Sequence, residues 1–146
     1  IIHTHTTAGM AVSACAEGLR PISFYAAAFA GQIAYHDFEG VTIRPEEGDR
    51  LIANLGSKRV MMLRNHGTLV MAASLPEAFL KHWSLQRACE IQVAASAAGT
   101  PVDIPADVIA VHQRDLAGVQ LPVGPGVPDF QAMVRVIDRI DSSWRQ

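Results

Sequence analysis

Residues 60–71 read VMMLRNHGTLVM, and they decide the fold because two apolar runs flank a short polar turn. The runs Val60–Leu63 and Leu69–Met71 have the length and apolar composition of buried strands. The turn between them holds Gly67, which is free to take a positive φ. The segment therefore predicts a hairpin whose two strands are buried.

The sequence on either side of this hairpin alternates between short strands and helices. Upstream we expect strands at 1–6, 32–38 and 41–43, and helices at 7–17 (capped by Thr7), 26–30 (capped by Ser23) and from Pro45 to near Gly56. Downstream, the capping box of Ser74 and Glu77 predicts the start of a long helix that ends at Gly99. Beyond it we expect an extended linker at 101–105, a short helix capped by Asp107, an irregular stretch at 118–128 and a final amphipathic helix capped by Asp129 and ending near Trp144.

This alternation predicts an α/β fold in which helices cover both faces of the sheet. The hairpin makes that sheet mixed instead of purely parallel. With 146 residues, the chain is expected to be a single domain, residues 1–146. Because it starts without methionine, inside an apolar strand, we expect its N-terminal elements to be missing and the domain to be N-terminally truncated.

Composition narrows the classes of partner. Hydrophobic residues make up 49% and charged residues 18%, which is typical of a folded domain. The net charge of −2 and the lack of a basic run argue against a nucleic-acid partner. No apolar run is long enough to cross a membrane, and nothing resembles a signal peptide. Cys15 and Cys89 lack metal-site spacing, so we expect buried free thiols in a cytoplasmic protein.

Three histidines form the candidate site. His3 and His5 point to the same face of the first expected strand, with backbones about 6.6 Å apart. His66 lies in the hairpin turn, and three convergent imidazoles would leave a metal position open for chemistry. His3, His5 and His66 are therefore the expected ligands of a divalent metal, provided that their rings converge. Zinc, copper, nickel and iron all accept imidazole, and zinc is the default by abundance.

For three other polar residues, a structural role is expected or is weighed against a functional one. We expect His36 to form a structural hydrogen bond with Asp37, with catalysis or a subunit contact as the alternatives. Asn65 is expected either to hold the second nitrogen of the turn histidine or to accept a left-handed backbone. For Glu90 we expect a buried ion pair with Arg87 instead of a catalytic role.

Several segments, in this order, resemble the class II aldolase/adducin family. The resemblance covers about residues 1–98, and it is greatest to the adducin-like branch. Residues 99–146 match only loosely and are expected to form a linker and C-terminal helices. The matching segments are IHTHT (2–6), AYHDFEG (34–40), LRNHG (63–67), EAF (77–79) and RACEIQV (87–93).

The resemblance implies a three-layer α/β/α sandwich that assembles as a homotetramer with active sites at subunit interfaces. It implies that His3, His5 and His66 hold a divalent ion, usually Zn²⁺, which in the aldolases of the family stabilises the enediolate left by carbon–carbon cleavage. In those enzymes a carboxylate and phosphate-binding loops lie upstream of the matching segments. The catalytic acid or base of this protein is therefore unknown and expected upstream of residue 1.

The leading functional hypothesis is a metal-dependent aldolase-type lyase. Its expected substrate is a small sugar, a sugar phosphate or a keto acid, and no cofactor other than the metal is expected. An epimerase or a dehydratase on the same scaffold would need similar chemistry. A noncatalytic adducin-like scaffold for protein interaction is the alternative from a different class.

Overall fold

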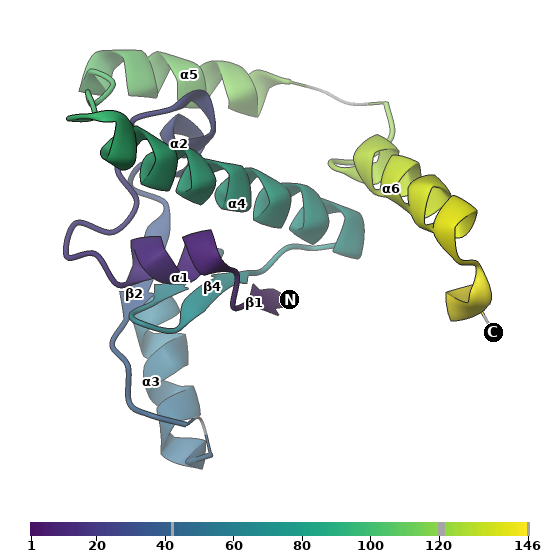
Figure 1. Ribbon diagram of the computed structural model, residues 1–146, viewed down its shortest axis with the longest axis horizontal. Coiled ribbons are helices and arrows are strands. Elements are labelled where there is room, and N and C mark those ends of the chain that lie inside the picture. Colours follow the sequence, from purple (N-terminus) through teal and green to yellow (C-terminus); the bar gives the residue numbers. More distant parts are fainter. Residues whose placement is uncertain (42, 120–121, 146) are drawn as a thin grey trace.

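The computed structural model describes residues 1–41, 43–119 and 122–145. Figure 1 shows how the elements are arranged. In chain order they are β1 (Ile2–Thr4), α1 (Thr7–Ser13), α2 (Phe24–Phe29), β2 (Ile33–His36), α3 (Pro45–Leu55), β3 (Val60–Leu63), β4 (Gly67–Val70), α4 (Leu75–Ala98), α5 (Ala106–Gly118), α6 (Val127–Ile140) and a 3₁₀ turn, Ser143–Arg145.

The strands form one mixed sheet in the order β1-β4-β3-β2. β3 and β4 are the antiparallel hairpin expected from the sequence, with Val60 opposite Val70 and Leu63 opposite Gly67. β1 adds antiparallel to the outer side of β4, and β2 adds parallel to β3. The single hairpin therefore accounts for the mixed sheet, as predicted.

Helices cover both faces of this sheet, which confirms the α/β layered fold. All of β3 is buried, and its side chains alternate between the two faces. On one face Val60 and Met62 pack with Val12 of α1, Phe29 of α2 and Leu85 and Cys89 of α4. On the other, Met61 and Leu63 pack with Ala34 and with Leu51 and Leu55 of α3. Figure 1 shows α3 and α4 on opposite sides of the strands.

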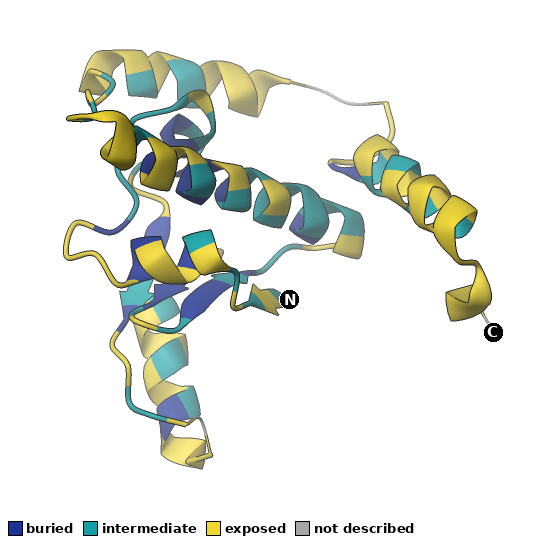
Figure 2. Ribbon diagram, viewed as in Figure 1, coloured by how far each residue is buried: buried dark blue, intermediate teal, exposed yellow. Residues whose placement is uncertain are grey.

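The last two helices lie outside this core. α5 packs on α2, and α6 packs on α4. Neither helix contains a buried residue, as the exposed and half-buried colours of Figure 2 show. Gln113 fastens α5 by donating to the carbonyls of Ala27 (3.0 Å) and Ala30 (2.9 Å), and the Phe130 ring lies 5.6 Å from that of Phe79.

Two of the expected helix caps are present. Ser23 accepts a hydrogen bond from the backbone of Ala26, and Ser74 accepts one from Glu77. At α1 the expectation is wrong by one residue, because Thr6 and not Thr7 accepts from the backbone of Gly9.

The predicted extension of α1 to residue 17 is also wrong. The helix ends at Ser13. Arg64 donates to the backbone carbonyls of Cys15 (2.6 Å) and Ala16 (3.2 Å), so these oxygens are engaged outside the helix.

Two further caps were wrongly predicted. Asp107 and Asp129 lie inside the first turns of α5 and α6, where a carboxylate interacts favourably with the helix dipole. Neither helix has a side-chain cap, because Pro105 and Gly126 occupy the capping positions. The strand expected at 41–43 is not formed by Val41 or Ile43, and residue 42 lies outside the described residues.

No helix among the described residues is both long enough and apolar enough to cross a membrane.

Candidate metal centre

The structure brings His3, His5 and His66 together. One ring nitrogen from each lies within 4.8 Å of the others. The Nε2 atoms of His3 and His5 are 2.8 Å apart. The ring centroid of His3 lies 4.7 Å from that of His5 and 5.0 Å from that of His66, and the centroids of His5 and His66 are 4.6 Å apart. The three imidazoles therefore surround one small space.

Strand pairing explains why residues so far apart in the sequence meet. β1 runs antiparallel to β4, with Thr4 opposite Thr68, so the end of β1 lies beside the start of β4. The turn that precedes β4 carries His66, and the residue that follows β1 is His5. The edge pairing therefore places both histidine motifs at one end of the sheet.

Asn65 and Gly67 shape the turn around His66 in different ways. Asn65 takes the left-handed conformation, with φ of 56°, which confirms one of its two expected roles, whereas Gly67 does not use its freedom to take a positive φ. Gly67 is needed for space instead. A Cβ there would clash with the Thr4 carbonyl oxygen and lie 3.2 Å from Cδ2 of His5. The missing side chain thus allows β1 and His5 to approach the turn.

The ring of His3 is held by the backbone of the neighbouring strand. Its Nδ1 lies 2.9 Å from the carbonyl oxygen of Thr68, a residue that is 1% exposed. A carbonyl only accepts hydrogen bonds, so Nδ1 carries the hydrogen and, in the neutral ring, Nε2 presents its lone pair to the cluster. Metal-binding histidines commonly have this kind of support.

The surroundings of His66 favour its neutral form. Burial lowers the pKa of His66 below its ordinary value, and the nearby His3 and His5 lower it further. A neutral imidazole is the form that binds a metal ion.

A pocket of about 570 Å³ opens beside the three rings. Apart from the histidines, its walls are apolar side chains and one glycine. Phe38 stands at its edge, 56% exposed, with its ring centroid 6.1 Å from that of His66. The lining residues are His3, His5, Phe38, Gly40, Val41, Leu51, Leu63, His66 and Leu69. The arrangement leaves room for a small molecule to reach the histidine nitrogens.

His36 has a different partner from the one expected. Its Nδ1 lies 2.8 Å from Nδ2 of Asn54, and its Nε2 lies 3.8 Å from Glu39 and 3.9 Å from Glu47. Both ring nitrogens face these residues and not Asp37, so the predicted bond between His36 and Asp37 is wrong. The ring instead faces α3, because β2 packs against that helix.

The remaining expectations are met in part. Arg87 and Glu90 form an ion pair at 2.6 Å, but it is exposed and not buried. Both cysteines are free, and burial raises the pKa of the Cys89 thiol to about 12. Cys15 is exposed, contrary to expectation.

Two parts of the site have no signal in the sequence. The Thr68 carbonyl acts through the backbone, which any residue provides. The role of Phe38 depends on how the loop after β2 folds, and spacing alone did not reveal this.

Comparisons with known proteins agree with this fold. The sequence model of the family described as Class II Aldolase and Adducin N-terminal domain matches residues 1–93. A Pseudomonas aeruginosa protein named "Putative aldolase class 2 protein" is 38% identical over 100% of this chain. Alpha-adducin of Rattus norvegicus is 38% identical over 96% of the chain. The chain spans only 58% and 20% of these two relatives.

Solved structures give the same result. The crystal structure of an aldolase II superfamily protein from Pseudomonas syringae is 41% identical, with a TM-score of 0.90 over 99% of this chain and 58% of that one. The L-fuculose 1-phosphate aldolase from Glaciozyma antarctica is 26% identical, with a TM-score of 0.67 over 78% of this chain and 43% of that one. This chain therefore belongs to the class II aldolase and adducin family.

Proposed function

We propose that this chain carries the metal site of an aldolase-type carbon–carbon lyase, with His3, His5 and His66 as ligands of one divalent cation. The observation that carries the proposal is the convergence of three ring nitrogens within 4.8 Å. Zn²⁺ is the best candidate, because catalytic zinc is commonly held by three protein ligands with a fourth position left open.

The geometry of the three rings fits such an ion. Bonds of about 2.0–2.1 Å in a tetrahedral site separate the ligand nitrogens by about 3.3 Å. The nitrogens of His3 and His5 are 2.8 Å apart, so small side-chain rotations suffice to share a cation. When bound, the ion would act as a Lewis acid toward a substrate oxygen that gains negative charge.

The protein residues around the site would then orient the substrate. The Thr68 carbonyl fixes the ring of His3, and Phe38 and Leu51 form an apolar wall of the adjoining pocket. We propose a small sugar, a sugar phosphate or a keto acid as substrate, and the similarity to an L-fuculose 1-phosphate aldolase supports the sugar phosphate among these. We assign proton transfer to no residue of this chain and expect that group upstream of residue 1.

We further propose that the protein works as a homotetramer in the cytoplasm. The tetramer follows from the family resemblance. The two free cysteines, one of them exposed, suit a reducing compartment.

Metal analysis of the purified protein tests the ligand set. We expect about one zinc ion per chain, and loss of that ion in His3→Ala and in His66→Ala. The matched control is His112→Ala in α5, which should keep the metal. If His3→Ala and His66→Ala kept as much metal as the wild type and the control, the ligand assignment would be refuted.

A chelation experiment tests the reaction. We expect the protein to cleave a ketose 1-phosphate such as L-fuculose 1-phosphate, and removal of the metal to abolish the cleavage. Restoring Zn²⁺ should restore it. Cleavage that continues after verified metal removal would rule out the proposed chemistry.

The second candidate is a noncatalytic scaffold, which the similarity to rat alpha-adducin favours. It predicts a well-folded protein that turns over no substrate of the classes named above. Metal content alone does not separate the two, because ligands can persist without turnover. Absence of bound metal in a folded full-length protein would favour the scaffold.

A further inference from the structure

We infer that Gln86 and His82 of α4 are positioning residues for the candidate ligand His5, and that they act through the hydroxyls of Thr6 and Thr4. The inference rests on the proposed metal site and adds to it residues that touch no ligand ring directly. The three candidate ligands differ in the support that their side chains and backbone receive.

His5 is the ligand with the least support of its own. The Thr68 carbonyl holds the ring of His3, and the hairpin turn holds His66, whose backbone donates to Leu63 at 3.1 Å. His5 is exposed and lies between β1 and α1. Within the described part of the chain, its Nδ1 has no hydrogen-bond partner. Apart from the contact of its Nε2 with Nε2 of His3 at 2.8 Å, the position of His5 therefore depends on the backbone on either side of it.

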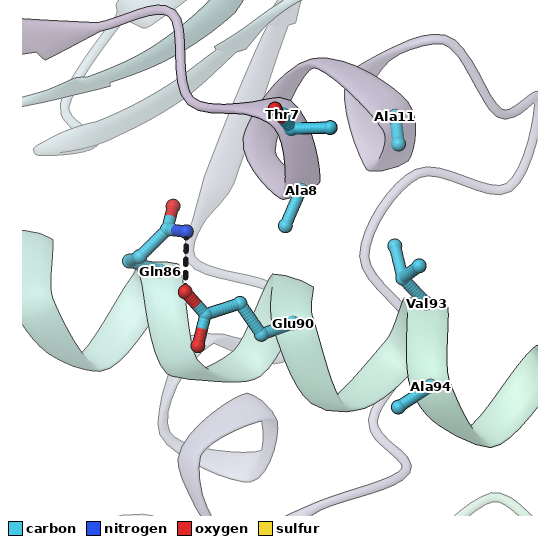
Figure 3. A pocket seen from close by; sticks show the side chains of 7 residues that line it. All are labelled: Thr7, Ala8, Ala11, Gln86, Glu90, Val93 and Ala94. Atoms are coloured by element: carbon cyan, nitrogen blue, oxygen red, sulfur yellow. Dashed lines mark hydrogen bonds between the residues drawn. The ribbon is translucent and has the colours of Figure 1, made fainter.

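Thr6 fixes the backbone on the C-terminal side. Its hydroxyl donates to Oε1 of Gln86 at 2.5 Å and accepts from the backbone of Gly9 at 3.2 Å. Nε2 of Gln86 donates to Glu90 at 2.7 Å, as Figure 3 shows, and Glu90 also pairs with Arg87. A carboxylate only accepts, so Glu90 turns the amide nitrogen of Gln86 toward itself and the amide oxygen toward Thr6.

Thr4 fixes the backbone on the N-terminal side. Its hydroxyl lies 3.1 Å from Nε2 of His82. His82 and Gln86 are one turn apart on α4, so they present their polar groups on the same face of the helix. The two contacts bracket His5 and tie both of its neighbouring threonines to one rigid element.

The contact between α1 and α4 is closely packed at Val12, Leu85 and Cys89, and it is open nearer to Thr7. A groove of about 460 Å³ separates the two helices there. Figure 3 shows short side chains of α1 on one side and α4 on the other, with Gln86 and Glu90 on the α4 side. The lining residues are Thr7, Ala8, Ala11, Gln86, Glu90, Val93 and Ala94. The apolar packing holds the two helices together, and the hydrogen bonds to Thr4 and Thr6 add a directional link beside His5.

The test substitutes Gln86→Leu in the full-length protein, which removes the acceptor at nearly constant side-chain size. Co²⁺ is the probe, because its affinity and its visible absorption spectrum both report on the ligands. We expect Co²⁺ binding to weaken by up to about 10-fold, the lower end of the effect of losing a group that contacts a ligand directly, because Gln86 acts through Thr6. The spectrum should change as well, which a role in folding alone would not produce.

Gln92→Leu is the matched control in the same helix. Gln92 also ties α4 to a loop, through the backbone of Arg20 at 2.7 Å and the carbonyl of Gly18 at 2.8 Å, but it lies away from the histidines. We expect this variant to lose stability while keeping the wild-type Co²⁺ affinity and spectrum.

A second pair keeps the test valid if Gln86→Leu does not fold. Thr6→Ser retains the hydroxyl and should bind Co²⁺ like the wild type, whereas Thr6→Val should bind it more weakly. Wild-type affinity and spectrum in both Gln86→Leu and Thr6→Val, together with loss of binding in His5→Ala, would overturn the inference and leave the metal site standing. A wild-type protein that binds no Co²⁺ would overturn the proposed function and this inference with it.

Discussion

Gly67 and Asn65 divide between them two tasks that a single glycine often performs in a turn. Asn65 supplies the left-handed backbone, and Gly67 supplies the space into which β1 and His5 fit. A short polar side chain such as asparagine tolerates this conformation better than most residues. The two positions should therefore respond differently to the same substitution.

Gly67→Ala should destabilise the protein by about 1–3 kcal/mol, because the new methyl group would overlap the Thr4 carbonyl and force the strands apart. Urea unfolding measures the loss, and a zinc titration should show weaker binding. Gly48→Ala in α3 is the control, since a Cβ there meets nothing within 4 Å and should stabilise the helix by about 0.5–1 kcal/mol. Equal stability of the two variants would contradict the role assigned to Gly67.

At residue 65, alanine and glycine should differ in their effect on stability. Asn65→Ala places an ordinary side chain at φ of 56° and should cost about 1–2 kcal/mol, whereas Asn65→Gly should be nearly neutral. Chemical unfolding of the pair distinguishes backbone strain from loss of the amide group. If glycine proves as costly as alanine, the asparagine side chain itself is what matters.

At the scale of elements, the sequence predicted the hairpin and the long helix well. Continuous apolar runs identified β3 and β4, and the Ser74 box identified the start of α4, because both signals are local. The predicted cap of α1 was wrong by one residue, because Thr6 and Thr7 are adjacent residues of the same type and either could cap a helix. Which of the two caps the helix is decided by where β1 leaves the sheet, and no local pattern contains that information.

Ser74→Ala should destabilise the protein by about 1 kcal/mol, because it leaves the backbone N–H of Glu77 without its capping oxygen. Ser96→Ala, near the other end of the same helix and exposed, should be neutral or slightly stabilising, since alanine has the higher helix propensity. Thermal unfolding followed by circular dichroism measures both. A loss of similar size in the two variants would argue against a specific cap.

At the scale of the whole molecule, the sequence predicted which histidines to compare but not how they would meet. His3 and His66 converge only because β1 pairs with the outer side of β4, a long-range contact that spacing does not encode. The links from Thr4 and Thr6 to α4 were missed for the same reason. Local periodicity predicts elements, whereas the support of a site depends on which elements become neighbours.

The stability of the metal-free protein should fall as the pH drops below about 6.5. Burial lowers the pKa of both His66 and His82 in the folded protein, so their ordinary pKa of 6.5 is regained on unfolding. The unfolded chain then binds protons first as the pH falls, which shifts the equilibrium toward it. The difference between the urea unfolding midpoints at pH 7.5 and pH 5.5 should be smaller in His82→Gln than in the wild type. An identical pH dependence in the two proteins would show that His82 does not contribute.

β1 is a three-residue strand at the edge of the sheet, yet His3 lies on it and His5 follows it directly. Within the described residues β4 is its one neighbouring strand, so its amides should exchange with deuterium faster than those of the buried β3. A cation bound by His3, His5 and His66 would cross-link this edge strand to the hairpin turn. Zinc should therefore slow deuterium uptake most strongly at residues 2–4, so that the least protected strand of the sheet becomes the best reporter of occupancy.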